Sequence, residues 1–349
     1  MNIYETELAY RAEEPLPWEK LEGRRILLSG ASGMIGKCII DILMRHNATT
    51  EKPIRILALS RNEEKARERF SAYWDDPSFT YLSCDVNVPL LECGKVDYMI
   101  HAASNTHPMQ YAGDPIGTIT ANVLGTKNLL DYGACHGAER FCFCSSVEIY
   151  GENRGDVEKF DEPYMGYIDC NTLRAGYPES KRVGETLCNA YRQAKGLSFT
   201  VARLSRVYGP TMLSGDSKAI AQFIRKAARG EDIVLKSEGN QKFSYTFVTD
   251  AAAGVLYTML SGKDGEAYNV ADGLSDITLR ELAGHLADIA GTKVIFELPG
   301  ENERRGYSTA TKAMLHAGKM EKLGWEARVH MAEGLASVVE ACRETGNET

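Results

Sequence analysis

The feature that most constrains the fold is a repeated alternation of short apolar runs and amphipathic stretches. The first apolar run, RRILLSG (24–30), ends in glycine and leads into an amphipathic stretch at 34–45. The alternation returns in apolar runs at 54–60, 96–104, 140–146 and 197–205, with helical stretches at 62–73, 115–135 and 177–195. Strands that alternate with helices form βαβ units joined by right-handed crossovers. The sequence therefore predicts an α/β fold with a doubly wound parallel sheet.

The alternation becomes less regular after about residue 205, which predicts a second, smaller unit. There we expect helices at 217–229, 251–260, 278–290 and 331–343 and strands at 233–237, 243–250 and 293–298. The predicted division is an N-terminal extension (1–20), a larger sheet domain (21–204 plus 242–272) and a smaller C-terminal α/β substrate lobe (205–241 plus 273–349). Ligands of open α/β sheets bind beyond the carboxyl ends of the strands, so we expect the lobe there. For the extension, packing against a dimer mate and packing against the larger domain both remain open.

Composition argues against nucleic acid, a membrane or a metal ion as the binding partner of this protein. The 349 residues carry a formal net charge of -8, so no basic field favours nucleic acid or an anionic membrane. No apolar run is long enough for a membrane span, and the first twenty residues lack the pattern of a secretory signal. The nine cysteines are scattered without a CxxC pair, which favours reduced thiols over a metal or redox site. We expect a cytoplasmic protein without a metal and with a small-molecule partner.

Glycines lie where the first predicted strand turns into the first helix. Gly30, Gly33 and Gly36 in GASGMIG let backbone N–H groups approach a diphosphate at the helix N-terminus. A glycine-rich turn is also found in tight βα turns that bind no ligand. Because these glycines follow the first strand of a repeated βαβ pattern, we interpret the larger domain as a dinucleotide-binding Rossmann domain.

The end of the second predicted strand indicates which dinucleotide binds. An acid usually binds the adenosine ribose hydroxyls there, but this strand ends in Ser60, Arg61 and Asn62. A guanidinium in place of a carboxylate suits the 2′-phosphate of NADP, so NADP is favoured over NAD. The alternative is that Arg61 only begins a solvated, charged helix. Asp85, after the third strand, is expected to contact the adenine, with a helix cap or turn as its alternative.

Tyr177 and Lys181 form the expected catalytic pair. In YPESK they lie four residues apart at the start of a predicted helix, so both side chains lie on one face. We expect the ammonium of Lys181 to lower the pKa of the Tyr177 phenol, which then accepts a hydroxyl proton while hydride leaves the same carbon. Ser145 and Ser146 end the fourth strand, where a hydroxyl can hydrogen-bond the reacting oxygen. Ordinary turn chemistry is the alternative for this serine pair.

Several longer motifs lie along the chain. They are GASGMIG (30–36), HAAS (101–104), NVLGTKNLL (122–130), SSVEIYG (145–151), YPESK (177–181), RLSRVYGP (203–210) and LGW (323–325). From about residue 22 onward, the chain thereby resembles the extended short-chain dehydrogenase/reductase family of nucleotide-sugar epimerases, dehydratases and decarboxylases. The resemblance implies catalysis by Ser146, Tyr177 and Lys181, and a homodimer packed through helices 115–135 and 177–195. The expected cofactor site is Gly30, Ser32, Gly33, Met34, Ile35, Gly36, Ser60, Arg61, Asn62, Asp85, Val86, Ala102, Ala103, Ser104, Asn122, Tyr177, Lys181 and Arg203.

Glu148 narrows the resemblance within that family. It stands where sugar dehydratases and UDP-glucuronate decarboxylases have a glutamate, whereas the acid that dehydratases carry before it is Val147 here. Arg174, three residues before Tyr177, also resembles the decarboxylases. Glu148 is therefore expected to be a catalytic acid or base on the carbon next to a transient ketone. An exposed loop carboxylate is the alternative.

Three positions depart from the family pattern. Arg206 stands where relatives have asparagine, Thr211 where decarboxylases have arginine, and Phe243 where many relatives have arginine. The phosphate-binding charge is thus relocated, and Arg206 with Lys242 is expected to hold a diphosphate. The expected substrate site is Thr106, Arg174, Arg206 and Lys242.

Three functions fit these observations. The leading one is an NAD(P)-dependent enzyme that modifies a nucleotide sugar by epimerisation, dehydration or decarboxylation, in which hydride leaves a sugar carbon, most simply C4, and later returns. The second is an NADPH-dependent reductase of a free or nucleotide-linked keto sugar. The third is a catalytically silent cofactor-sensing or scaffold protein, since fold alone does not fix function. An intact set of Ser146, Tyr177 and Lys181 counts against the third.

Overall fold

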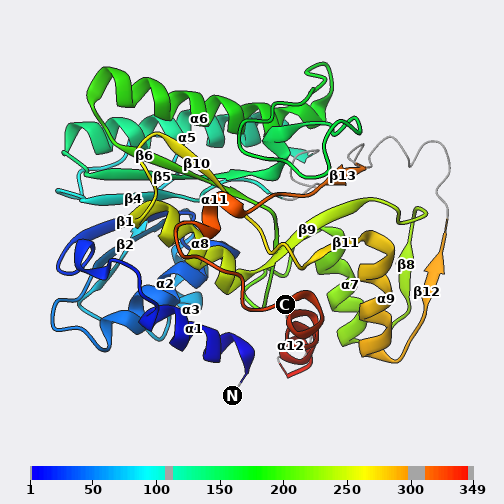
Figure 1. Ribbon diagram of the computed structural model, residues 1–349. Helices are drawn as coiled ribbons and strands as arrows, with labels where there is room; N and C mark the ends of the chain where they lie inside the picture. The colour runs from blue at the N-terminus through cyan, green and yellow to red at the C-terminus, as the bar shows by residue number, and fades with distance from the viewer. Residues whose placement is uncertain (1, 107–112, 298–310, 345–349) are drawn as a thin grey trace.

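The computed structural model describes residues 2–106, 113–297 and 311–344. Its centre is a seven-stranded parallel sheet with the strand order β10-β6-β5-β4-β1-β2-β3. The strands are β1 (Arg25–Ser29), β2 (Arg55–Ser60), β3 (Phe79–Ser83), β4 (Tyr98–His101), β5 (Arg140–Ser146), β6 (Phe199–Leu204) and β10 (Glu266–Val270). Ile26, Leu27 and Leu28 of β1 are fully buried, because helices cover both faces of a parallel sheet. The predicted doubly wound α/β fold is confirmed (Figure 1).

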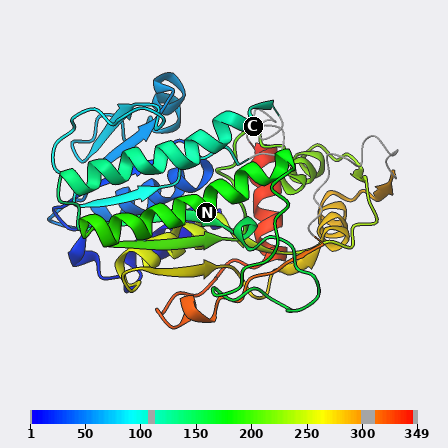
Figure 2. The same ribbon diagram turned by 90° about the horizontal axis from the view of Figure 1, so that it is seen from above.

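Helices cover the main sheet on both faces (Figure 1). One face carries α5 (Pro115–Cys135) and α6 (Gly176–Lys195), which run side by side in Figure 2. The other face carries α2 (Met34–Asn47), α8 (Val248–Leu260) and the N-terminal helix α1 (Ile3–Glu13). After β2, α3 (Glu63–Arg69) is shorter than the predicted helix 62–73, because the chain turns after Arg69 and buries Phe70. Within the described residues, no helix has the length and apolar character needed to cross a membrane.

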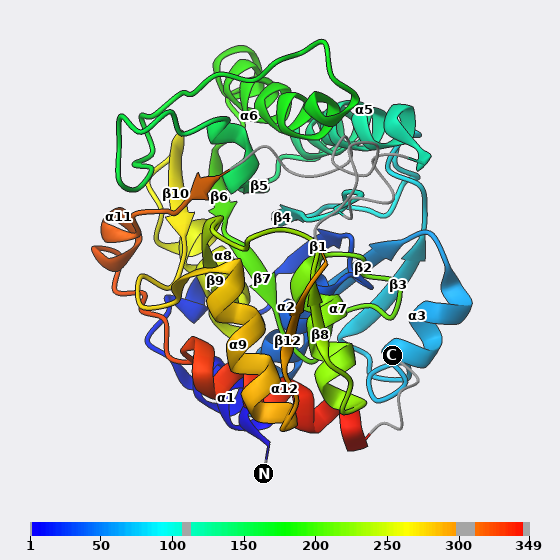
Figure 3. The same cartoon turned by 90° about the vertical axis from the view of Figure 1, so that its right-hand side faces the viewer.

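The smaller unit is built on two short sheets. β9 (Lys242–Phe247) pairs with β7 (Arg206–Tyr208), β11 (Asp276–Thr278) and β13 (Lys312–Ala313), and β8 (Ile233–Leu235) pairs with β12 (Val294–Phe296). The helices of this part are α7 (Ala219–Ala228), α9 (Leu279–Ala290) and α12 (Met331–Glu344), and α11 (Gly318–Glu321) lies beside β10. This unit lies to the right of the main sheet in Figure 1, and Figure 3 views it from that side.

The segment 242–272 contributes to both units, whereas the sequence assigns all of it to the larger domain. β9 lies in the sheet of the smaller unit, while α8 covers the main sheet and β10 is its edge strand. The predicted strand 243–250 ends at Phe247, because Val248 already begins α8. Asp250 lies in the first turn of that helix, where a carboxylate is favoured by the helix dipole.

The N-terminal extension is an integral part of the fold. α1 packs against α2 and α8. The Tyr4 hydroxyl donates to Asp41 over 2.6 Å, and the Trp18 ring, in the 3-10 turn Trp18–Lys20, stacks on His46 with centroids 4.1 Å apart. Of the two placements that the sequence leaves open, the structure shows packing against the larger domain.

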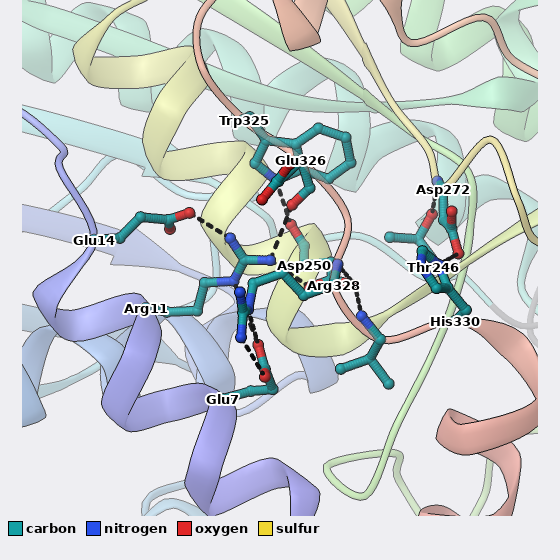
Figure 4. Close-up of polar contacts among 11 residues, drawn as sticks. Glu7, Arg11, Glu14, Thr246, Asp250, Asp272, Trp325, Glu326, Arg328 and His330 are labelled. Atoms are coloured by element: carbon teal, nitrogen blue, oxygen red, sulfur yellow. Dashed lines mark hydrogen bonds and ion pairs between the residues drawn. The ribbon is translucent and has the colours of Figure 1, made fainter.

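Arg11 is the centre of a buried ion network that ties α1 to distant parts of the chain (Figure 4). Its guanidinium donates to Glu14 over 2.5 Å and to Asp250, on α8, over 2.6 Å. Arg328 pairs with Glu7 over 3.0 Å, and its backbone N–H donates to Asp250 over 3.2 Å. Residues from both ends of the sequence are thereby fixed to the helix that supports the main sheet.

Candidate active site

The loop between β1 and α2 forms a cradle into which only glycines fit. Gly30 has a φ of +75°, and a Cβ there would lie 2.5 Å from the backbone nitrogen of Ala103. A Cβ at Gly36 would lie 2.3 Å from the Gly30 carbonyl oxygen. Gly33 caps α2 without a side-chain hydrogen bond, and the first turn carries no acid, so the first N–H groups of the helix suit an anion. Ser32, Met34 and Ile35, also predicted to bind the cofactor, lie in this loop and first turn.

The loop after β4 lies against this cradle. Ala102 and Ala103 are the residues that a Cβ at Gly30 would meet, and Ser104 follows them. The strand before them ends in His101, whose Nδ1 lies 2.7 Å from the Ser29 hydroxyl on β1. Burial, with a smaller effect of the Lys181 charge, lowers the pKa of His101 to about 3, so the ring is neutral. Sequence reasoning missed His101, although a histidine at the end of an apolar strand run was a visible signal.

The residues at the ends of β2 and β3 make mostly local contacts. The Ser60 hydroxyl lies 3.2 Å from the Tyr81 hydroxyl, and Arg61 is exposed. Asn62 caps α3 by accepting the Lys65 N–H over 2.9 Å. Asp85 accepts the Asn87 N–H over 2.9 Å in a turn, and the Val86 carbonyl accepts from Asn128 over 2.8 Å. For Asn62 and Asp85, the contacts shown are therefore those of a helix cap and a turn residue.

The structure brings Tyr177, Lys181 and Ser146 together at the carboxyl end of β5. Ser146 is the last residue of β5, and Tyr177 lies in the first turn of α6 and forms a hydrogen bond with Ser146. The Lys181 ammonium donates to the Cys144 carbonyl over 2.8 Å. It lies 4.8 Å from the ring centroid of Phe143 and 6.0 Å from that of Tyr177. The predicted catalytic set is thus one cluster.

The predicted effect of Lys181 on Tyr177 is not the dominant one. Burial raises the pKa of Tyr177, the hydrogen bond with Ser146 opposes this rise, and the charge of Glu148 adds to it. Burial also lowers the pKa of Lys181 to about 8. The protein by itself therefore keeps the phenol protonated, because desolvation outweighs the hydrogen bond with Ser146.

Asn122 supports the first turn of α6. On α5, its amide nitrogen donates to the Ser180 hydroxyl over 2.9 Å, and that hydroxyl donates to the Tyr177 carbonyl over 2.9 Å. All three residues are buried. The contacts of Asn122 within the protein therefore position the first turn of α6, which carries Tyr177.

Glu148 and Arg206 form a contact between the turn after β5 and strand β7 of the smaller unit. Glu148 lies in the 3-10 turn Val147–Tyr150 that follows β5. Arg206 begins β7, and its guanidinium nitrogen lies 3.6 Å from a Glu148 carboxylate oxygen. The guanidinium carbon lies 3.8 Å from the ring centroid of Phe243, on the neighbouring strand β9. Phe243 was noticed in the sequence only as a departure from relatives, and its contact with Arg206 required the pairing of two distant strands.

Other predicted residues lie apart from this cluster. Arg203 is buried, and its guanidinium donates to Glu185 over 2.7 Å and 3.1 Å, to the Tyr150 hydroxyl over 3.0 Å and to the Glu162 carbonyl over 2.6 Å. These contacts are those of a structural cation, and the cofactor contact expected for Arg203 stays a prediction.

Three substrate-site predictions fall at the margins of the cluster. Lys242 begins β9, where it is paired in register with Thr278, and its charge acts on Glu281 of α9. Arg174 lies in the 3-10 turn Leu173–Ala175 just before α6. Thr106 is the last described residue of its segment. Of the four predicted substrate residues, Arg206 contacts Glu148, which follows Ser146 in the chain.

Metal-binding side chains do not gather in the described part of the chain. Within it, no group of three or more histidine, cysteine, aspartate or glutamate side chains is placed to hold a metal ion. The structure shows no disulfide among the described residues.

Comparison with known proteins relates this geometry to a family. Residues 26–271 match the model of the NAD dependent epimerase/dehydratase family. UDP-glucuronic acid decarboxylase 5 of Arabidopsis thaliana is 30% identical over 322 residues, which cover 91% of this chain and 89% of that protein. UDP-glucuronic acid decarboxylase 1 of Xenopus tropicalis is 29% identical, with 92% and 72% covered.

Solved structures show the same fold. The dTDP-glucose 4,6-dehydratase of Streptomyces venezuelae, with NAD bound, has a TM-score of 0.79 and 25% identity, covering 92% of this chain and 97% of that one. The UDP-glucose 4-epimerase of Thermotoga maritima has a TM-score of 0.79 at 23% identity, covering 92% and 99%. The resemblance expected from the motifs is confirmed, as is the interpretation as an enzyme. The chain belongs to the NAD-dependent epimerase/dehydratase family.

Proposed function

We propose that the protein oxidises one carbon of a nucleotide sugar to a transient ketone, acts on the neighbouring carbon and then reduces the ketone again. The observation that carries this proposal is the buried Tyr177 hydroxyl, hydrogen-bonded with Ser146 and influenced by Glu148. Ser146 and Ser29 end strands of one parallel sheet, and the glycine cradle follows Ser29 at the edge where such sheets bind ligands. The curated relatives that act on UDP-glucuronic acid support this class of reaction.

Tyr177 moves the substrate proton. Burial keeps its phenol protonated until a positive charge in addition to that of Lys181 is near. When bound, the oxidised nicotinamide supplies that charge together with a hydride acceptor. Tyr177 Oη accepts the proton of the sugar hydroxyl, Ser146 holds the same oxygen, and Lys181, protonated at neutral pH because its pKa is about 8, stabilises the phenolate. On the return step Tyr177 gives the proton back to the ketone oxygen.

Glu148 decides what happens beside the ketone. A ketone weakens bonds on the neighbouring carbon, so a carboxylate there can remove or deliver a proton, and a carboxyl group there can leave as carbon dioxide. Decarboxylation of a nucleotide-linked uronic acid is the first candidate, because the similar curated proteins are UDP-glucuronic acid decarboxylases and Val147 replaces the acid typical of dehydratases. Epimerisation and dehydration use the same first step.

The residues present fit a dinucleotide, and we propose NADP over NAD. The cradle of Gly30, Gly33 and Gly36 would hold the diphosphate, and Arg61 at the end of β2 would hold a 2′-phosphate. Mass spectrometry of the cofactor released by denaturing the purified protein tests this choice. Released NADP(H) is expected, and NAD(H) alone would reverse the preference.

A second candidate follows from the same arginine. Ser60 and Arg61 also suit a reductase that consumes NADPH and uses Tyr177 as proton donor. The two functions differ in cofactor balance, because a recycling enzyme shows no net oxidation of NADPH during turnover. Stoichiometric loss of NADPH with a keto sugar would favour the reductase.

We also propose a homodimer that packs through α5 and α6, in a cytoplasmic protein. Ile116, Ile119 and Leu124 of α5 and Val183 of α6 are exposed apolar side chains. Light scattering coupled to size-exclusion chromatography is expected to give twice the chain mass. Ile119→Glu is expected to shift the protein to the monomer.

The direct test is product analysis. The holoenzyme is incubated with UDP-glucuronate, UDP-glucose or dTDP-glucose, and the masses of the nucleotide sugars are then measured by mass spectrometry. We expect loss of carbon dioxide from UDP-glucuronate, and no product with Tyr177→Phe. No conversion of any of the three sugars would reject the proposal.

A further inference from the structure

Arg206 is a cation whose hydrogen-bonding capacity is largely unused. Its guanidinium carbon lies over the Phe243 ring, 3.8 Å from the centroid, and a contact with a ring face uses none of the guanidinium N–H groups. Its Nε is buried and has no hydrogen-bond partner within the described residues. A buried donor without a partner is costly, so such a group points to a ligand.

The contact between Arg206 and Glu148 is loose. The single distance of 3.6 Å is longer than a hydrogen bond, and the side chains are 24% and 28% exposed. The buried pair of Arg203 and Glu185 differs, because two donors of Arg203 reach the carboxylate over 2.7 Å and 3.1 Å. Arg206 can therefore exchange Glu148 for another anion.

Glu148 places this exchange beside the reacting carbon. It lies in the turn capped by Ser146, whose hydroxyl accepts the Glu148 N–H over 3.2 Å, and its charge acts on Tyr177, whose hydroxyl must meet the hydroxyl of the sugar carbon that is oxidised. A second anion brought in by the substrate would be repelled by Glu148 and attracted by Arg206. Because Arg206 lies against Glu148, the anion that it meets is on the sugar, whereas the sequence alone suggested the diphosphate.

We propose that Arg206, stacked on Phe243, is a specificity-determining residue that leaves Glu148 and binds a carboxylate carried by the sugar. This inference rests on the proposed function, since it names how a nucleotide-linked uronic acid is told apart from its neutral counterpart. The exchange has a second consequence. Glu148 loses its cation when the substrate binds and becomes available as a free base or acid beside the ketone.

Opposite effects of two substitutions follow from the exchange. Arg206→Gln removes the receptor for the carboxylate, so binding of the uronic acid weakens. Glu148→Gln removes the competing anion, so binding of the uronic acid becomes tighter. A merely structural ion pair would give losses in both variants. Phe243→Leu removes the stacking surface and is expected to give a smaller loss than Arg206→Gln.

The experiment measures binding without turnover. Isothermal titration calorimetry on the cofactor-loaded Tyr177→Phe protein compares UDP-glucuronate with UDP-glucose, which differ only in the sugar carboxylate. Arg206→Gln is expected to raise the Kd for UDP-glucuronate by about ten- to hundred-fold, the size of a charged hydrogen bond, and that for UDP-glucose by less than about three-fold. Arg229→Gln, which removes a guanidinium from an exposed pair with Glu231 on α7, is the matched control.

The outcomes separate this inference from the proposed function. If Arg206→Gln weakened the binding of both nucleotide sugars equally, the inference would be overturned, since Arg206 would then bind the diphosphate that they share. Weaker UDP-glucuronate binding in Glu148→Gln would overturn it as well. If neither nucleotide sugar binds the Tyr177→Phe protein with Arg206 and Glu148 intact, the proposed function is rejected, and the inference that rests on it is rejected as well.

Discussion

Arg11 and Lys181 are both buried cations, but they are compensated in opposite ways. The Arg11 side chain is 0% exposed and is surrounded by the carboxylates of Glu7, Glu14 and Asp250. Lys181 is 2% exposed, and within the described residues no carboxylate lies within ion-pair distance of its ammonium. It contacts the Cys144 carbonyl and the faces of aromatic rings. The charge of Arg11 is therefore neutralised within the protein, whereas that of Lys181 has no carboxylate partner among the described residues.

The difference separates structure from function in this molecule. A buried charge costs several kcal/mol unless it is paired, so the protein gains nothing in stability from Lys181. Burial lowers the pKa of Lys181 to about 8, and this shift measures that cost. An unpaired charge persists where chemistry requires it. Arg11 is equally buried but is paired with carboxylates, and it holds α1 against α8 and the C-terminal segment (Figure 4).

The largest expected effect on stability is that of Arg11→Leu. Its removal leaves Asp250 and Glu14 buried without their cation, and the free energy of unfolding is expected to fall by about 3–5 kcal/mol. Urea unfolding followed by circular dichroism measures this. Turnover below the unfolding transition is expected to stay near that of the unmodified protein. A stability unchanged within error would show that α1 is not fixed by this network.

Arg203 is a third buried cation, and its substitution tests whether it serves stability, like Arg11, or ligand binding, as we propose for Lys181. It is paired with Glu185 like Arg11, although the sequence predicts a cofactor ligand. Arg203→Leu is expected to lower the free energy of unfolding by about 2–3 kcal/mol, while the Kd for the dinucleotide stays within about three-fold. Titration of the refolded variant with NADP checks the second part. A large loss of cofactor affinity with an unchanged free energy of unfolding would show instead that Arg203 binds the cofactor.

Lys181→Met is expected to stabilise the protein while it abolishes turnover. Removing an unpaired buried charge should raise the free energy of unfolding at pH 7 by about 1–2 kcal/mol. The sign of the pH dependence follows from the folded pKa, about 8, which is below the ordinary lysine value. The penalty in the unmodified protein is complete below pH 8 and shrinks as the pH rises further. The advantage of Lys181→Met is therefore expected to be smaller at pH 9 than at pH 7. A destabilised variant at pH 7 would contradict the comparison.

The smallest effect is expected at an exposed pair. Arg192 pairs with Asp264 over 2.7 Å, but the side chains are 50% and 36% exposed. Arg192→Gln is expected to change the free energy of unfolding by less than about 1 kcal/mol. The same urea experiment serves as the control for Arg11, since the ion-pair distances are similar but Arg192 is exposed and has one carboxylate partner.

Local patterns in the sequence were sufficient for much of the fold and site. The strand and helix alternation predicted the parallel sheet, because apolar runs and 3.6-residue spacing report burial directly. The glycines of GASGMIG predicted the cradle, since each contact that excludes a side chain at Gly30 and Gly36 lies close to a strand end. Tyr177, Lys181 and Ser146 were predicted as a cluster from their places at the end of a strand and the start of a helix.

What the sequence did not predict depends on contacts between distant segments. Arg11 and Asp250 are 239 positions apart, and no local pattern marks their pairing. The stacking of Arg206 on Phe243 depends on the pairing of β7 with β9, which the sequence assigned to different domains. The direction of the Tyr177 pKa shift depends on burial, and sequence spacing reports only that Lys181 is near.

The central claim is that Tyr177 moves the proton that allows the sugar to be oxidised. The most direct test is to mix the holoenzyme, with its cofactor oxidised, rapidly with UDP-glucuronate. The absorbance of the reduced nicotinamide is then recorded over time. The unmodified protein is expected to show a transient rise that returns to the baseline. In Tyr177→Phe the rate of that rise is expected to fall by about 10²- to 10⁴-fold, with UDP-glucuronate binding retained. A rise of undiminished rate in Tyr177→Phe would contradict the account.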